Sequence, residues 1–192
     1  MTATNATFAL LSIMFSVGLP VFASEALGAP VWVLGVLFAT NTALLATIQT
    51  LAVRMLEGRR RTRALAFAAL LWCGWCLLLA LTPAVPQPLV VPYLFAAAAV
   101  FTLAELVHAP TSNALAAAAS PEPSRGRYLA AFQLSWAVAW VLAPTLFSLL
   151  FAGGAALPWT LLAGLALAAG VATLLVEGRL PAGAVKSGSE PA

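Results

Sequence analysis

ELVHAPTSNALAAAASPEPSRGRYLAAFQLSW, residues 105–136, contains the features that decide the fold. It ends one long apolar run that carries Glu105 and His108, passes through a short loop with Arg125 and Arg127, and opens another apolar run. An ionisable side chain at the centre of a membrane helix costs about 2.5 to 3.5 kcal/mol on insertion scales. Residues kept at that cost usually handle ions or substrate, which makes Glu105 and His108 the first functional candidates.

The composition predicts an integral membrane protein. The chain is 62% hydrophobic and 8% charged, with a mean hydropathy of +1.00, whereas soluble domains carry roughly 25% charged residues. The net charge of +3 gives no footprint for nucleic acid. The first residues, MTATNAT, lack Lys and Arg, so we expect the first apolar run to remain as a membrane helix rather than a cleaved signal peptide.

Six apolar runs reach the length of about 20 residues that one membrane crossing needs. Short segments of turn and breaker composition separate them. The sequence therefore predicts an all-α transmembrane domain over residues 1–177, and a disordered cytoplasmic tail over residues 178–192. The predicted spans are 7–27, 31–53, 64–83, 89–119, 128–152 and 157–176.

The basic residues predict the orientation. All of them follow the second, fourth or sixth run, which puts them on one side of the membrane. The positive-inside rule makes that side cytoplasmic, so both termini are predicted to be cytoplasmic in a multi-pass cell-membrane protein. The nine residues are Arg54, Arg59, Arg60, Arg61, Arg63, Arg125, Arg127, Arg179 and Lys186.

Polar side chains are distributed unevenly among the runs. Runs 1, 2, 4 and 5 carry several, including Asn41 and Gln49 in the second and Gln133 in the fifth, whereas runs 3 and 6 carry few. Runs 3 and 6 can therefore face lipid all round, while the others have polar groups to bury or to line a wet cavity with. The order polar, polar, apolar occurs twice, which is typical of two three-helix units.

Each candidate residue also has a structural interpretation. Glu105 and His108 lie on one helix face and form either a proton-coupled pair that faces the substrate, with Glu105 titrating and His108 tuning it, or part of the hydrogen bonding of the bundle. His108 alone is more typical of a structural residue. Asn41 and Gln49 either line a cavity or join helices. The arginines at 59–63 bind anionic lipid, gate the inner face, or set topology alone.

Two motifs carry a family resemblance. QTLAVRMLEGRRRTR, Gln49–Arg63, is similar to the Gly- and Arg-rich loop between the second and third helices of each half of a major facilitator superfamily transporter, with Arg54, Gly58, Arg59 and Arg60 as its loop residues. The 105–136 stretch resembles that family's junction of the fourth and fifth helices. The matching residues there are Glu105, Pro110, Pro121, Arg125, Gly126, Arg127 and Tyr128.

Over residues 7–177 the chain thus resembles the C-terminal half of such a transporter, of the drug/proton antiporter branch. The resemblance implies alternating-access transport of a small solute, as proton-coupled efflux, with no catalytic residue, metal or cofactor. It also implies a second six-helix half, from another chain or a second copy, because family members place the substrate site between two halves. A non-transporting truncated fragment is an alternative. Val53 replaces the family's loop Asp, so that residue's charge-relay role is not carried over.

An enzyme-class alternative rests on Trp72-Cys73-Gly74-Trp75-Cys76, which has the C-x-x-C spacing of thioredoxin-type redox sites. Such thiols need a helix N-terminus and access to solvent. Cys73 and Cys76 lie in the middle of an apolar run, where cysteine behaves as a small hydrophobe. A membrane thiol oxidoreductase is therefore the weaker hypothesis.

Overall fold

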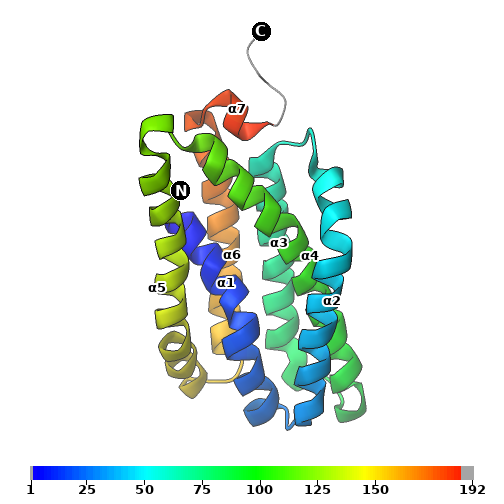
Figure 1. Cartoon of the computed structure of the whole chain (residues 1–192). Coiled ribbons are helices and arrows are strands. Elements are labelled where there is room, and N and C mark those ends of the chain that lie inside the picture. The colour runs from blue at the N-terminus through cyan, green and yellow to red at the C-terminus, as the bar shows by residue number, and fades with distance from the viewer. Residues whose placement is uncertain (1, 187–192) are drawn as a thin grey trace.

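The computed structural model describes residues 2–186, and within that range it is an all-helical bundle without strands (Figure 1). Six of its helices are long and apolar enough to cross a membrane, as the composition predicted. Short π or 3-10 turns extend or precede several of them. The elements are α1 Thr2–Val21, η1 Phe22–Ala26, α2 Val31–Leu56, α3 Arg61–Leu81, η2 Thr82–Ala84, α4 Gln87–Ala119, η3 Glu122–Ser124, α5 Arg125–Ala152, α6 Leu157–Val176, η4 Glu177–Arg179 and α7 Ala182–Val185.

Glycine and proline set the boundaries between the first three helices. Gly28 has φ +59° and Gly58 has φ +71°, a left-handed conformation that glycine adopts without the strain a Cβ would add. Pro30 then precedes α2 as its N-cap, which suits proline because it lacks a backbone donor. The α2–α3 turn therefore holds its arginines in a sharp reversal at one end of the bundle.

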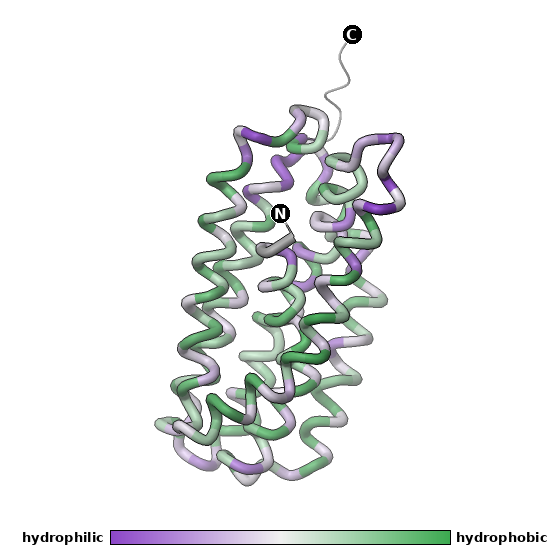
Figure 2. Tube along the Cα trace, turned by 90° about the vertical axis from the view of Figure 1, so that its left-hand side faces the viewer, coloured by the Kyte–Doolittle hydropathy of each residue, from purple (hydrophilic) through white to green (hydrophobic). Residues whose placement is uncertain are grey.

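That end, which we call the arginine end, carries the α2–α3 turn, the α4–α5 turn and residues 177–186 together (Figure 1). Hydrophilic residues concentrate there, while the length of the bundle is mostly hydrophobic (Figure 2). Helix α4 has 33 residues, or about 50 Å of helix against a hydrocarbon core of about 30 Å. Its last turns therefore belong to the arginine end.

The core of the bundle is aromatic. Helix α3 packs against α4 and α6, and α1 packs against α5 and α6. Phe15 of α1 stacks on Phe101 of α4 with ring centroids 4.2 Å apart. Trp75 of α3 lies 4.7 Å from Phe101 and 5.4 Å from Trp159 of α6, centroid to centroid. These rings join four of the helices into one unit.

The expectation that the third and sixth runs face lipid all round is wrong. Trp72, Trp75 and Trp159 are fully buried, and Gly170 of α6 approaches Ala69 of α3 closely. Lipid is as apolar as leucine, so small residues and complementary shape decide which membrane helices pack together. Lack of polarity therefore did not make α3 and α6 peripheral. Helix α2 is the more exposed, with Val33 and Leu37 as its buried residues.

The tail also differs from the expectation of disorder beginning at residue 178. Residues 177–186 fold back as η4 and α7, and α7 packs against α3 and α4. Leu180 and Ala184 join Leu65 and Leu115 in a small apolar cluster. The polar composition of the tail did not predict this contact. Few apolar side chains form it, because Arg60 and Arg61 also bind residues of this segment. Residues 187–192 of the predicted tail lie outside the described residues.

Candidate functional site

A hydrogen-bonded network surrounds Glu105 where α1, α2 and α4 meet. Ser12 Oγ of α1 donates to Glu105 Oε1 at 2.6 Å. The side chain of Asn41, on α2, lies near the same carboxyl and interacts with it. Thr102 Oγ1, one turn before Glu105 on α4, donates to Asn41 Oδ1 at 2.7 Å. Since Oδ1 accepts from Thr102, the amide nitrogen is the donor that Asn41 has left to offer to the carboxylate.

Neutral groups alone form this environment of Glu105 among the described residues. The one ion pair between residues 2 and 186 joins Arg60 and Glu177, at the arginine end. Hydroxyl and amide dipoles therefore hold the Glu105 carboxyl without a fixed positive charge. The carboxyl therefore has no ion-pair partner among the described residues, and its hydrogen bond to Ser12 joins α4 to α1.

His108 occupies a different environment from Glu105. Its side chain is 1% exposed, and its ring lies 5.0 Å from that of Phe8 and 4.8 Å from that of Trp72, centroid to centroid. Nε2 has no hydrogen-bond partner among the described residues. The spacing predicted one face for Glu105 and His108, but the structure gives the first a polar setting and the second an aromatic one.

Of the remaining predicted pathway residues, one belongs to the network and two do not. Asn41 belongs to it, but Gln49 on α2 and Gln133 on α5 are exposed on the surface of the bundle. Two members that sequence reasoning did not single out are Ser12 and Thr102. Ser12 lies 93 residues from Glu105, and no spacing rule relates residues at that separation.

The predicted loop motifs lie at the arginine end. Arg54, Gly58, Arg59 and Arg60 are exposed around the α2–α3 turn, and Arg125, Gly126 and Arg127 are exposed in the first turn of α5. Arg60 forms an ion pair with Glu177, which also accepts a hydrogen bond from Thr62. The motif thus fastens the end of α6 to the start of α3, a contact that the sequence did not suggest.

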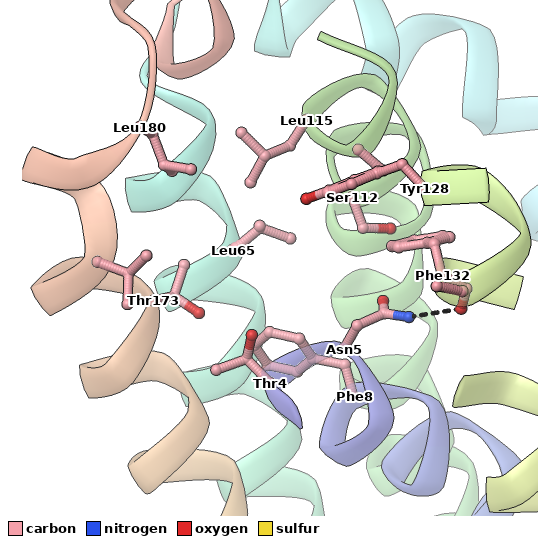
Figure 3. Close-up of a pocket in the computed structure, with 13 residues that line it drawn as sticks. Thr4, Asn5, Phe8, Leu65, Ser112, Leu115, Tyr128, Phe132, Thr173 and Leu180 are labelled. Carbon is pink, nitrogen blue, oxygen red and sulfur yellow. Dashed lines mark hydrogen bonds between the residues drawn. The ribbon is translucent and has the colours of Figure 1, made fainter. Parts of the chain in front are cut away.

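A pocket opens at the arginine end, above the start of α1 (Figure 3). It measures about 630 Å³, counting the space at its mouth. Asn5 lies in its wall and donates from Nδ2 to Phe132 O at 3.2 Å and to Ser135 Oγ. Glu105 and its partners do not line this pocket, so the molecule has two distinct polar regions.

The two cysteines are free and buried in the middle of α3. Cys76 is fully buried, and Cys73 is 7% exposed. Thiol chemistry needs access for a second thiol or an oxidant, which this packing denies. The arrangement does not favour the thiol oxidoreductase hypothesis.

Comparison with known proteins identifies the family. A family model described as Major Facilitator Superfamily matches residues 1–192. The chain belongs to this superfamily. Its members are transporters that bind small-molecule substrates, which agrees with the expectation of a non-enzyme and makes the chain a multi-pass membrane-transport protein. The searches among curated proteins and among solved structures gave no match.

Proposed function

We propose that the chain moves a small, lipophilic solute by alternating access as one half of a proton-coupled efflux transporter of the cell membrane. Glu105 carries the proton. A change in its charge alters its interactions with Ser12 of α1 and Asn41 of α2. The observation that supports this most is a carboxylate within a candidate span that accepts a hydrogen bond from another helix and has no ion-pair partner among the described residues. Intramembrane carboxylates of this kind commonly belong to proton relays.

A second six-helix half, in another chain or a second copy, completes the solute site in this proposal. The exposed apolar side chains of α2 and α5 support it, because they form broad faces that the bundle itself does not cover. They include Trp32, Leu51 and Met55 on α2, and Leu134, Trp140 and Val141 on α5. Gln49 and Gln133 lie on these two helices and would face the shared cavity. His108, on the same helix as Glu105, tunes the proton affinity of that carboxyl in this proposal.

The arginine end is cytoplasmic in this proposal, and both termini lie on that side. The clustering of the α2–α3 turn, the α4–α5 turn and residues 177–186 at one end supports it, because basic residues favour the cytoplasmic face. Reporter fusions at residues 1 and 192 test it: two cytoplasmic signals are expected, and a periplasmic signal from either fusion contradicts it.

The transport test uses the full chain reconstituted in liposomes with an imposed pH difference. Ethidium, a lipophilic cation, is the probe, and its movement is followed by fluorescence. We expect Glu105→Gln to abolish the component of transport that depends on the pH difference while exchange of ethidium across the membrane continues. Glutamine keeps the hydrogen-bonding shape of the site but cannot titrate.

Glu25→Gln is the matched control, because Glu25 is an exposed carboxylate in η1 at the opposite end of α1. It should leave proton-driven transport unchanged. Unaltered proton coupling in Glu105→Gln would remove Glu105 from the mechanism. Absence of movement of ethidium, and of a neutral and an anionic dye tested beside it, in the wild type would show that a second copy does not complete the site. It would leave a different partner chain or the non-transporting alternative.

A further inference from the structure

The pocket at the arginine end has the composition of a ligand site. The space between its walls is about 630 Å³ with the open solvent at its mouth included, and its lining combines apolar side chains with a few polar groups, as small-molecule pockets do. It lies inside this single six-helix unit, between α1, α3, α4, α5 and α6. Because Glu105 does not line it, ligand binding there can be measured apart from proton coupling at that residue.

The lining of the pocket is mostly apolar, with Leu65, Leu115 and Leu180 grouped near one another (Figure 3). Its polar side chains include Asn5 and Ser112. Among the described residues that line it, none is Asp, Glu, Lys, Arg or His. A charged ligand would lose its hydration there without gaining a counter-charge. The pocket therefore suits an uncharged molecule with an apolar body and a hydrogen-bonding group.

Residues 177–186, which we call the C-terminal strap, lie against this pocket. Leu180 of the strap lines it and packs with Leu65 and Leu115, which line it too. If the strap moved away, the pocket would lose Leu180 from its lining and its mouth would be wider.

The strap is held by residues of the α2–α3 turn and the first turn of α3. Arg60 pairs with Glu177, and Thr62 donates to the same carboxylate. Arg61 Nη1 donates to the carbonyl oxygens of Gly183 at 3.2 Å and Ala184 at 2.8 Å. The anchors are polar and partly exposed, whereas the surface that they hold closed is apolar.

We propose that the pocket binds an uncharged amphipathic small molecule and that the C-terminal strap is its lid. The apolar body of the ligand lies against Leu65, Leu115 and Leu180, and its polar group faces Asn5 and Ser112. Release of Glu177 from Arg60 opens the mouth, and the return of Leu180 to the leucine cluster closes it.

Photolabelling tests the site. The probe is 3-azioctanol, an uncharged linear alcohol with a photoreactive diazirine, applied to the full chain in lipid nanodiscs and mapped by mass spectrometry. We expect saturable adducts within residues 112–132 that excess 1-octanol removes. Ala116→Leu, which places a larger side chain in the pocket wall, should lower them at least about fivefold.

Ala118→Leu is the matched control, because Ala118 is exposed on the same helix and should leave labelling unchanged. Adducts spread over lipid-facing residues such as Leu167, without competition by 1-octanol, would overturn the site. So would equal labelling in Ala116→Leu and wild type. If Ala116→Leu does not fold, protection of Ser112→Cys from N-ethylmaleimide by 1-octanol, in a Cys73→Ala/Cys76→Ala background, decides instead: protection supports the site and its absence rejects it.

The lid is tested with the same Ser112→Cys chain. Glu177→Gln removes the charge that Arg60 binds, and we expect N-ethylmaleimide to label the thiol at position 112 about two- to fivefold faster, the range for a partly exposed ion pair. Glu122→Gln, an exposed carboxylate in η3 at the same end, should not change the rate. An unchanged rate in Glu177→Gln would reject the strap as a lid while leaving the photolabelling result to judge the pocket.

Discussion

The aromatic core and the Glu105 network both lie between helices, but the rings of the core are buried, whereas Ser12, Asn41 and Glu105 are half-buried. In the core, the indole nitrogens of Trp72, Trp75 and Trp159 have no hydrogen-bond partner within the described residues. In the network, the carboxyl of Glu105 accepts a hydrogen bond from Ser12 of α1 and interacts with the side chain of Asn41 of α2. In the core, ring contacts therefore occur together with unpaired indole nitrogens. In the network, hydrogen bonding satisfies a carboxyl.

We expect the aromatic core to determine the stability of the bundle and the Glu105 network to determine its proton binding. Membrane helices associate mainly through close packing, because moving an apolar side chain from lipid to a helix interface gains no hydrophobic free energy. Interhelical hydrogen bonds in membranes average about 0.6 kcal/mol. The core should therefore carry most of the stability of the bundle, and the network should contribute little to it while controlling proton binding.

The largest effect is expected from emptying the core. Trp159→Ala removes a side chain that contacts Phe22, Trp75 and Phe147 and should lower the free energy of unfolding by about 3 kcal/mol, because the cavity forfeits these contacts. Titration of the purified protein with sodium dodecyl sulfate measures it. Trp140→Ala is the control, since Trp140 is 51% exposed; equal losses in the two variants would show that the rings do not form a core.

A smaller loss is expected from wedging the α3–α6 contact apart. A Cβ at Gly170 would lie 2.9 Å from the Cβ of Ala69, so Gly170→Leu should cost about 1 to 3 kcal/mol of unfolding free energy. Gly164→Leu in the same helix is the control, because a Cβ at Gly164 meets nothing within 4 Å. The same detergent titration compares them, and a tolerated Gly170→Leu would contradict the close approach of α3 and α6.

The smallest effect on stability is expected in the network. Thr102→Val removes the hydroxyl that donates to Asn41 while keeping the branched shape, and should cost about 0.6 kcal/mol. Its unfolding curve should nearly overlay the wild-type curve, yet proton-driven transport should fall because Asn41 loses its orientation. A loss of stability as large as that of Trp159→Ala would place the network among the structural elements instead.

The sequence predicted the all-helical bundle with six candidate spans because each span is an apolar run bounded by Gly, Pro or Arg. It also predicted the superfamily, through the Arg-rich loop and the junction around Arg125. The drug/proton antiporter branch stays a prediction. Polarity failed to predict which helices are buried, since α3 and α6 pack through small and aromatic residues that resemble lipid-facing ones in composition.

At the candidate site the sequence identified Glu105 and Asn41 but not their partners. Ser12 is distant in the chain, and only the packing of α1 on the bundle brings it to the carboxylate. Glu105 and His108 lie three residues apart on α4, but the first has a polar neighbour on α1 and the second has aromatic neighbours. Neighbours from other helices decide the chemistry, and a single sequence does not contain them.

Infrared difference spectroscopy of the full chain in nanodiscs tests the central claim, that Glu105 binds and releases a proton within the bundle. As the pH is changed, one protonated-carboxyl stretch should appear and disappear. Glu105→Gln should remove that band, Ser12→Ala should shift its frequency by removing a hydrogen bond, and Glu25→Gln should leave it in place. A band that survives in Glu105→Gln, or a Glu105 carboxyl that shows no change at any pH at which the protein stays folded, would contradict the account.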